Sequence, residues 1–155
     1  MVTISVLELS SAQSMRKSLE SIASGSGGLD AHRESMLNRV PEINDWARFP
    51  LNHLEMKDLA YLTAKTGHEF AILRGKREDI LYHGDFRRCT FDGVLVDMLL
   101  TRKLGIYGHS HPGEEIPVAS PEDRETLRLI GQHESRLISG YSGREIVFTD
   151  DPFEI

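Results

Sequence analysis

One stretch of the chain, residues 104 to 131, constrains the fold more than any other. Leu104 to Tyr107 is a short apolar run that predicts a buried strand, and it leads directly into Gly-His-Ser-His-Pro-Gly. Ser120 followed by Pro121 predicts a helix start, because a serine hydroxyl caps free amides and proline suits the first helical position. Gly131 is a natural end for that helix. The apolar positions of the predicted helix are Leu127, Leu129 and Ile130.

Two histidines stand at the end of the predicted strand. If the backbone stays extended through His111, the two-residue alternation sends His109 and His111 to the same face. Catalytic zinc takes three protein ligands, and Asp123 at the start of the next helix is the candidate for the third. The same residues also have an explanation without metal. Ser120 and Asp123 form a helix-capping pair, and an isolated His-x-His is often a surface feature.

The pattern His-Ser-His-Pro followed by Ser-x-x-Asp resembles the JAMM motif of the MPN-domain zinc metalloproteases, which include deubiquitinating isopeptidases and many bacterial relatives. The resemblance implies that His109, His111 and Asp123 bind Zn2+ and that Ser120 supports the oxyanion. It also implies an MPN-like (cytidine-deaminase-like) α/β fold, a mixed β-sheet flanked by helices. Eight residues separate His111 from Ser120 where the common pattern has seven. The placement of Ser120 depends on how the loop absorbs the extra residue.

The family also uses an upstream glutamate at the beginning of a strand that follows a helix. Glu69, in Thr66-Gly-His-Glu-Phe-Ala-Ile-Leu, is similar to that position. The resemblance therefore implies that Glu69 is the general base and acid for a zinc-activated water. Glu114 and Glu115 are rivals for this role, and an exposed carboxylate at a strand end is the alternative explanation of Glu69. His68 is expected on the surface.

The rest of the chain predicts one α/β domain with an N-terminal extension. Residues 1–28 are expected to be a helical arm, Ser11 to Ile22, with a Gly/Ser linker, and residues 29–155 the metalloprotease-like domain. The arm is expected to bind a partner or to belong to a longer polypeptide. Further predicted helices are Ala31 to Asn38, Glu55 to Thr66 and Phe91 to Arg102, and predicted strands are Glu69 to Arg74, Asp79 to Tyr82, Arg136 to Ile138 and Glu145 to Phe148. Four apolar residues after Pro41 are expected to cover the core from outside: Trp46, Phe49, Leu51 and Leu54.

Composition excludes several classes of protein. A formal net charge of −6 argues against a nucleic-acid binder, and no apolar run approaches the length of a membrane span. Cys89 is the single cysteine, which excludes an internal disulfide and predicts a small buried residue. At 155 residues the chain is too short for an eight-stranded amidohydrolase barrel. A cytoplasmic protein, or one delivered inside a larger bacterial polypeptide, is expected.

Two functions remain in competition at this point. The first is a zinc-dependent peptidase or isopeptidase acting on a protein or peptide, including conjugates of a ubiquitin-like modifier. The second is a catalytically silent MPN-like binding or scaffold module, or a domain of a bacterial toxin or phage polypeptide. The four motif residues together with Glu69 favour the enzyme.

Overall fold

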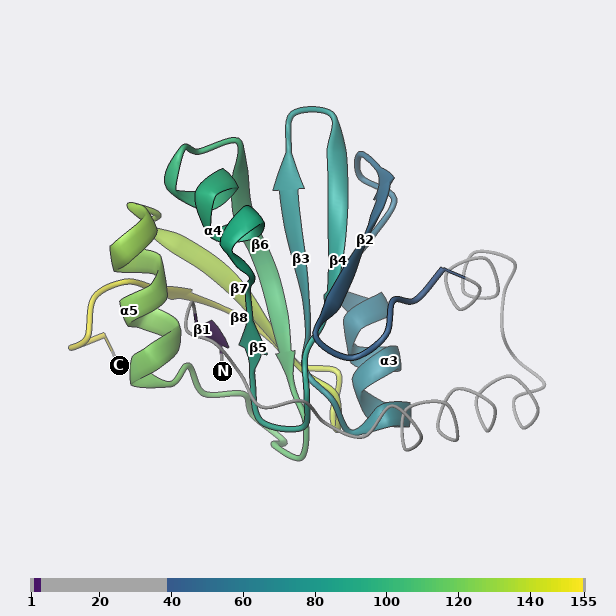
Figure 1. The fold of residues 1–155 in the computed structure, drawn as a ribbon. Helices are drawn as coiled ribbons and strands as arrows, with labels where there is room; N and C mark the ends of the chain where they lie inside the picture. Colours follow the sequence, from purple (N-terminus) through teal and green to yellow (C-terminus); the bar gives the residue numbers. More distant parts are fainter. Residues whose placement is uncertain (1, 4–38, 155) are drawn as a thin grey trace.

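The computed structural model describes residues 2–3 and 39–154. A six-stranded mixed sheet forms the centre, with the strand order β2-β4-β3-β6-β7-β8, and helices cover both of its faces (Figure 1). The sequence-based prediction of an α/β fold is confirmed at this level. The strands are β1 (Val2–Thr3), β2 (Asp45–Pro50), β3 (Phe70–Gly75), β4 (Glu78–His83), β5 (Cys89–Thr90), β6 (Leu104–His111), β7 (Glu134–Ser139) and β8 (Glu145–Thr149). The described helices are α3 (Met56–Thr66), α4 (Gly93–Leu100) and α5 (Pro121–Ile130).

The connections of the sheet follow from the lengths of the segments between strands. β3 and β4 form the predicted antiparallel hairpin, in which Arg74 pairs with Asp79 next to the turn. Only β6 and β7 run parallel in the six-stranded sheet described, and α5 provides the crossover that parallel neighbours require. The predicted strand at residues 104–107 continues to His111, because β3 and β7 pair with it on both sides.

Each face of the sheet has its own apolar core. α3 covers one face and packs so closely on β6 that a side chain at Gly108 would meet the sulfur of Met56. α4 and α5 cover the other face. The core under α3 contains Phe49, Leu54, Met56, Leu59, Leu62, Phe70, Ile72, Leu81 and Ile138. The core under α4 and α5 includes Ala71, Leu73, Leu95, Leu99, Ile106, Leu127, Leu137 and Phe148.

The prediction that the apolar residues after Pro41 cover the core from outside holds for Trp46, which is half-buried against the core, and is wrong for Phe49, Leu51 and Leu54. Residues 45 to 50 form β2, an edge strand paired along its whole length with β4, and Phe49 lies buried in the core under α3. Pro50 at its end weakened the strand signal in the sequence, although proline is tolerated at an edge. Leu51, by contrast, is exposed. The helices predicted at 11–22 and 31–38 lie outside the described residues, and so does the Gly/Ser linker that divides the predicted domains at residue 28.

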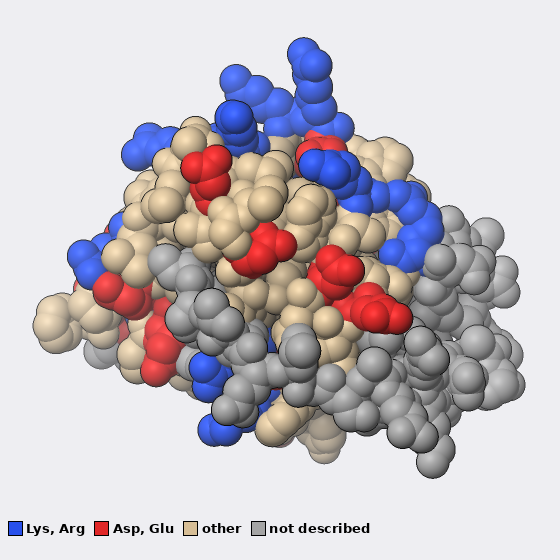
Figure 2. Space-filling view, in the orientation of Figure 1, with Lys and Arg blue, Asp and Glu red and all other residues tan. Residues whose placement is uncertain are grey.

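Charge is distributed unevenly over the molecule. Basic side chains gather at one end of the sheet, around the β3–β4 turn and the end of α4 (Figure 2). The exposed residues there are Lys76, Arg77, Arg102 and Lys103. The predicted metal-binding residues lie at the opposite end of the sheet, where β6 finishes and β3 begins.

Candidate metal centre

His109, His111 and Asp123 come together at the end of β6, as the sequence predicts. The two histidine Nε2 atoms are 3.2 Å apart. Asp123 Oδ1 lies 3.2 Å from His109 Nε2, and Asp123 Oδ2 lies 3.3 Å from His111 Nε2. All three residues are buried. Two imidazole nitrogens and the two oxygens of one carboxylate are thus close enough together for these three residues to bind one ion.

The spacing of these atoms matches that required by zinc. With bonds of about 2.0–2.1 Å to tetrahedral zinc, neighbouring ligand atoms are about 3.3–3.4 Å apart. The observed separations of 3.2–3.3 Å lie close to this value. The protonation states of His109 and Asp123 also favour metal binding. Burial lowers the pKa of His109 to about 4, which keeps the imidazole neutral, while contacts with His109 and His111 overcome the effect of burial and hold the pKa of Asp123 well below its usual value.

The helix start fixes the position of Asp123. Ser120 is the N-cap of α5, and its Oγ accepts a hydrogen bond from Asp123 N at 3.1 Å. Asp123 Oδ2 accepts in return from Ser120 N at 3.0 Å. The predicted capping pair therefore exists together with the ligand cluster, and the two explanations of Asp123 are compatible. The role of Ser120 as oxyanion support stays a prediction, since its hydroxyl oxygen is engaged in the cap.

Glu69 belongs to the same buried cluster of side chains. Its position follows from two local features: Gly67, with φ of 75°, ends α3 and redirects the chain, and β3 places Ala71 opposite His109. Glu69, two residues before Ala71, falls on the same face of the sheet. A carboxylate oxygen of Glu69 lies within 4.8 Å of a nitrogen of each site histidine, and the residue is 3% exposed. The alternative of an exposed carboxylate is therefore wrong.

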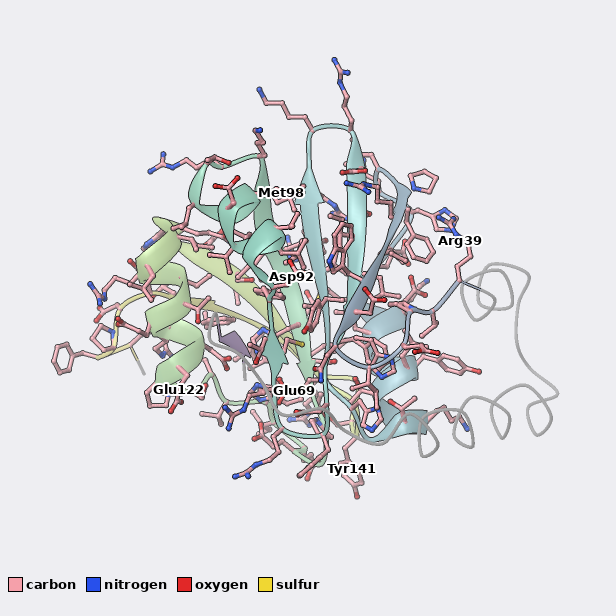
Figure 3. The ribbon with its side chains drawn as sticks, viewed as in Figure 1. Arg39, Glu69, Asp92, Met98, Glu122 and Tyr141 are labelled. Atoms are coloured by element: carbon pink, nitrogen blue, oxygen red, sulfur yellow. The ribbon has the colours of Figure 1, made fainter. Side chains whose placement is uncertain are left out.

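The backbone around Glu69 is held rigidly, and its carboxyl is strongly affected by the surroundings. Glu69 N donates to Asp85 O, and Gly84 N donates to Glu69 O, both at 2.8 Å. Burial raises the pKa of the Glu69 carboxyl well above its ordinary value, and the nearby charge of Asp123 raises it further. Figure 3 shows Glu69 toward the end of the sheet opposite to that of Met98.

Two glutamates of the loop before α5 were rivals of Glu69. Glu114 Oε2 lies 3.4 Å from His111 Nδ1, the nitrogen that faces away from Asp123, and also accepts from Val118 N at 3.0 Å. Glu115 is exposed. Glu114 therefore lies where a carboxylate orients a metal-binding imidazole, a role that the sequence analysis missed although the i, i+3 spacing from His111 was a signal.

The loop between His111 and Ser120 is anchored by the turn between β7 and β8. The hydroxyl of Ser139 donates to the carbonyl oxygen of Glu114, and that of Ser142 donates to the carbonyl oxygen of Glu115. These bonds fix a loop that is one residue longer than the family pattern. They also link the loop to β7, the parallel neighbour of the histidine strand.

Ser110, between the two histidines, points to the other face of the sheet. Its Oγ lies 2.6 Å from Thr63 Oγ1 on α3 and accepts from Phe70 N at 2.9 Å. This buried hydroxyl joins β6 to α3 and to the start of β3, directly after Glu69. Sequence analysis assigned it no role, because nothing in the local pattern shows which distant groups face it.

His68 was expected on the surface, and this prediction is wrong. It is 5% exposed, and its Nδ1 lies 2.9 Å from Nε2 of His83, which is also buried. His83 Nδ1 lies 2.9 Å from the carbonyl oxygen of Pro41. The pairing of β3 with β4 brings the two histidines together, since Phe70 is opposite His83. The expectation that Cys89 is buried is confirmed.

Comparisons of the chain with family models, with curated proteins and with solved structures found no match. In the part of the chain that the structure describes, no helix has the length and apolar character needed to cross a membrane.

Proposed function

We propose that the protein is a zinc-dependent peptidase or isopeptidase with His109, His111 and Asp123 as the metal ligands. The observation that carries the proposal is a set of three contacts of 3.2–3.3 Å, which join the two Nε2 atoms to each other and each of them to one oxygen of the Asp123 carboxylate. Two imidazoles and one carboxylate form a common catalytic zinc ligand set, and they leave a fourth position for water. Bound zinc lowers the pKa of water to about 7 and polarises a carbonyl group.

Glu69 is the proposed proton carrier. It is buried, its backbone is hydrogen-bonded on both sides, and its carboxylate lies within 4.8 Å of both histidines, so it is close enough to contact either the metal or a water bound to it. A carboxylate in this position accepts a proton from the attacking water and returns it to the nitrogen of the leaving amine. Asp123 is proposed as the third ligand because each of its two carboxylate oxygens lies 3.2–3.3 Å from the Nε2 atom of one imidazole.

The arrangement of elements supports an MPN-like domain of the JAMM type. The glutamate stands between a helix and the strand that follows it, a later strand carries His-x-His, and the next helix begins with Ser-x-x-Asp, all around one mixed sheet. Ser120 is proposed to support the oxyanion through its hydroxyl hydrogen, since its oxygen already accepts from Asp123 N. The proposed substrates are proteins or peptides, including ubiquitin-like conjugates, and the proposed setting is the cytoplasm or a larger bacterial polypeptide.

A silent scaffold is the second candidate, and the capping pair favours it. The reciprocal bonds of Ser120 and Asp123 give both residues a structural role that needs no metal. They do not explain two buried histidines with their Nε2 atoms directed at the same carboxylate. The measured zinc content separates the candidates, because a scaffold with no metal requirement should purify without it.

The direct test is a screen of peptides and of ubiquitin-like isopeptide conjugates with purified full chain. Hydrolysis should stop when a chelator is added and return with zinc. The His109→Ala/His111→Ala variant provides the matched control for contaminating peptidases and should be inactive with or without zinc. Hydrolysis that resists the chelator, or that survives in this variant, would contradict the proposal.

A further inference from the structure

The shortest ladder of the structure lies beside the metal centre. β1 pairs in parallel with β5, with Val2 opposite Cys89 and Thr3 opposite Thr90. The two strands form a separate small sheet and do not join the six-stranded one. β1 also contacts α5. Figure 1 shows β1 between α5 and β5, at the level where β6 ends.

Both neighbours of β1 belong to the walls of the centre. α5 carries Asp123 at its start. β5 reaches the centre through Gly84, where an added β-carbon would lie 2.9 Å from Cys89 Sγ and also 2.9 Å from the carbonyl oxygen of Glu69. Burial raises the pKa of the Cys89 thiol, and the charges of Glu69 and Asp123 raise it further, which agrees with this proximity. A chain segment bound along β5 therefore borders the centre.

The binding mode of Val2–Thr3 is not specific to these two residues. A strand edge binds extended backbone through its N–H and C=O groups, and any extended peptide presents the same groups. A ladder of only two residues supplies few such bonds, and a two-stranded sheet is marginal in water without further support. The contacts of β1 with α5 add to this pairing, but the backbone groups of β5 would bind a peptide from outside in the same way as they bind Val2–Thr3.

We propose that β5 is a docking edge for an extended peptide and that the chain's own Val2–Thr3 occupies this edge in the structure, masking the metal centre. The claim of masking rests on the proposed function, while the claim of docking does not. The competing explanation is that β1 is a permanent part of the fold. In that case no peptide can replace it, and its loss should damage the domain.

The test uses the full chain with Val2→Pro/Thr3→Pro, because proline removes the amide hydrogens needed by a ladder. The matched control carries Ser26→Pro/Gly27→Pro, which adds the same residues in the Gly/Ser-rich stretch. The probe is a fluorescent peptide with the sequence of residues 1–10, MVTISVLELS, and the measurement is fluorescence anisotropy. A second peptide with prolines at its positions 2 and 3 checks that binding uses the backbone.

While Val2–Thr3 occupies the edge, the probe can bind only to molecules in which β1 has detached from β5. The apparent affinity of the probe is therefore its intrinsic affinity multiplied by the fraction of such molecules. We therefore expect the proline variant to bind the probe at least about tenfold more tightly than the wild type and the control. The peptide with prolines should bind none of them. Equal affinity of all three proteins, or no binding to the variant, overturns the proposal.

Folding of the variants is checked by circular dichroism and zinc content. If the proline variant does not fold, Val2→Gly/Thr3→Gly in the full chain asks the same question, because it keeps both amide hydrogens but weakens the strand. Here a gain in affinity of about threefold is expected, and no gain overturns the proposal.

The outcomes for docking and for catalysis are distinguishable. If the probe binds as expected but the protein hydrolyses no substrate, the docking proposal stands. The proposals of peptidase activity and of masking are then refuted. If hydrolysis depends on zinc but the probe does not bind as expected, the peptidase proposal stands and the docking proposal is refuted. If both hold, masking further requires the proline variant to hydrolyse its substrate several-fold faster than the control. An unchanged rate would contradict it.

Discussion

The described part of the molecule contains two pairs of buried histidines, and the pairs differ in the groups that their ring nitrogens face. In the pair His109 and His111, both Nε2 atoms face the carboxylate of Asp123. In the pair His68 and His83, one ring bonds to the other and the second ring then bonds to the carbonyl oxygen of Pro41. In the first pair the ring nitrogens are directed at one carboxylate. In the second pair the two rings form a series of hydrogen bonds that ends at a backbone carbonyl oxygen.

This difference shows that burial and proximity of histidines do not by themselves define a metal site. His68 and His83 satisfy each other's nitrogens, and burial lowers the pKa of His83 to about 3, so the ring is neutral and structural. His109 Nδ1 has no hydrogen-bond partner among the described residues, and its ring packs edge-on against Phe148. A carboxylate directed at both Nε2 atoms is what distinguishes the candidate metal centre.

The largest effect is expected when the two histidine pairs are removed one at a time and the zinc content is measured. We expect His109→Ala/His111→Ala to lose bound zinc completely, because a single carboxylate does not retain it. His68→Gln/His83→Gln should keep one zinc per chain, although with lower stability. Elemental analysis of both purified variants makes the measurement. Zinc retained by the first variant would mean that the assigned ligands are wrong.

Glu69→Gln separates proton transfer from metal binding. The variant should keep its zinc and its melting temperature, while hydrolysis falls by at least about a hundredfold, the usual cost of losing a general base. The matched control is Glu115→Gln on the exposed loop, which should hydrolyse at the wild-type rate. A wild-type rate for Glu69→Gln would instead direct attention to Glu114 or Glu115.

Glu114→Gln tests whether the contact on the far side of His111 matters. Loss of a carboxylate that orients a metal-binding imidazole typically weakens the metal by about tenfold to a hundredfold. We expect the lower end of this range, since the Glu114 side chain is 43% exposed. A competition titration with a chelator measures the change, and an unchanged zinc affinity would show that Glu114 serves only the loop.

The smallest expected effect concerns the second pair and its dependence on pH. The folded pKa of His83 is about 3, below the unfolded value of about 6.5, so the unfolded chain binds a proton first as the pH falls. Stability is therefore lost between about pH 6.5 and pH 3. His83→Asn should reduce this loss by roughly 1 kcal/mol per pH unit in urea unfolding between pH 6.5 and 4. Identical slopes for both proteins would contradict the assignment.

Local patterns in the sequence predicted much of the fold and of the site. The hairpin of β3 and β4, the helices α3, α4 and α5, and the convergence of His109 and His111 follow from apolar periodicity and from the two-residue alternation of a strand. Asp123 was predictable because the same residue starts a helix. These features depend on residues close together in the chain.

Features that depend on distant partners could not be predicted. β2 is a strand because β4 lies beside it, and His68 is buried because the register of the hairpin places His83 next to it. The bond from Ser110 to Thr63 and the pairing of Val2 with Cys89 likewise join residues far apart in the sequence. No periodicity within a single segment reports such contacts.

The most direct test of the central claim is an anomalous difference map from zinc-containing crystals, recorded at the zinc absorption edge. Zinc ligation by His109, His111 and Asp123 predicts one peak at about 2.0–2.1 Å from His109 Nε2, His111 Nε2 and an oxygen of Asp123, with Glu69 outside the bonding distance. A peak bonded to Glu69 in place of Asp123 would contradict the assigned ligand set. The absence of any peak between the two histidines, in crystals grown with stoichiometric zinc, would contradict the metal centre itself.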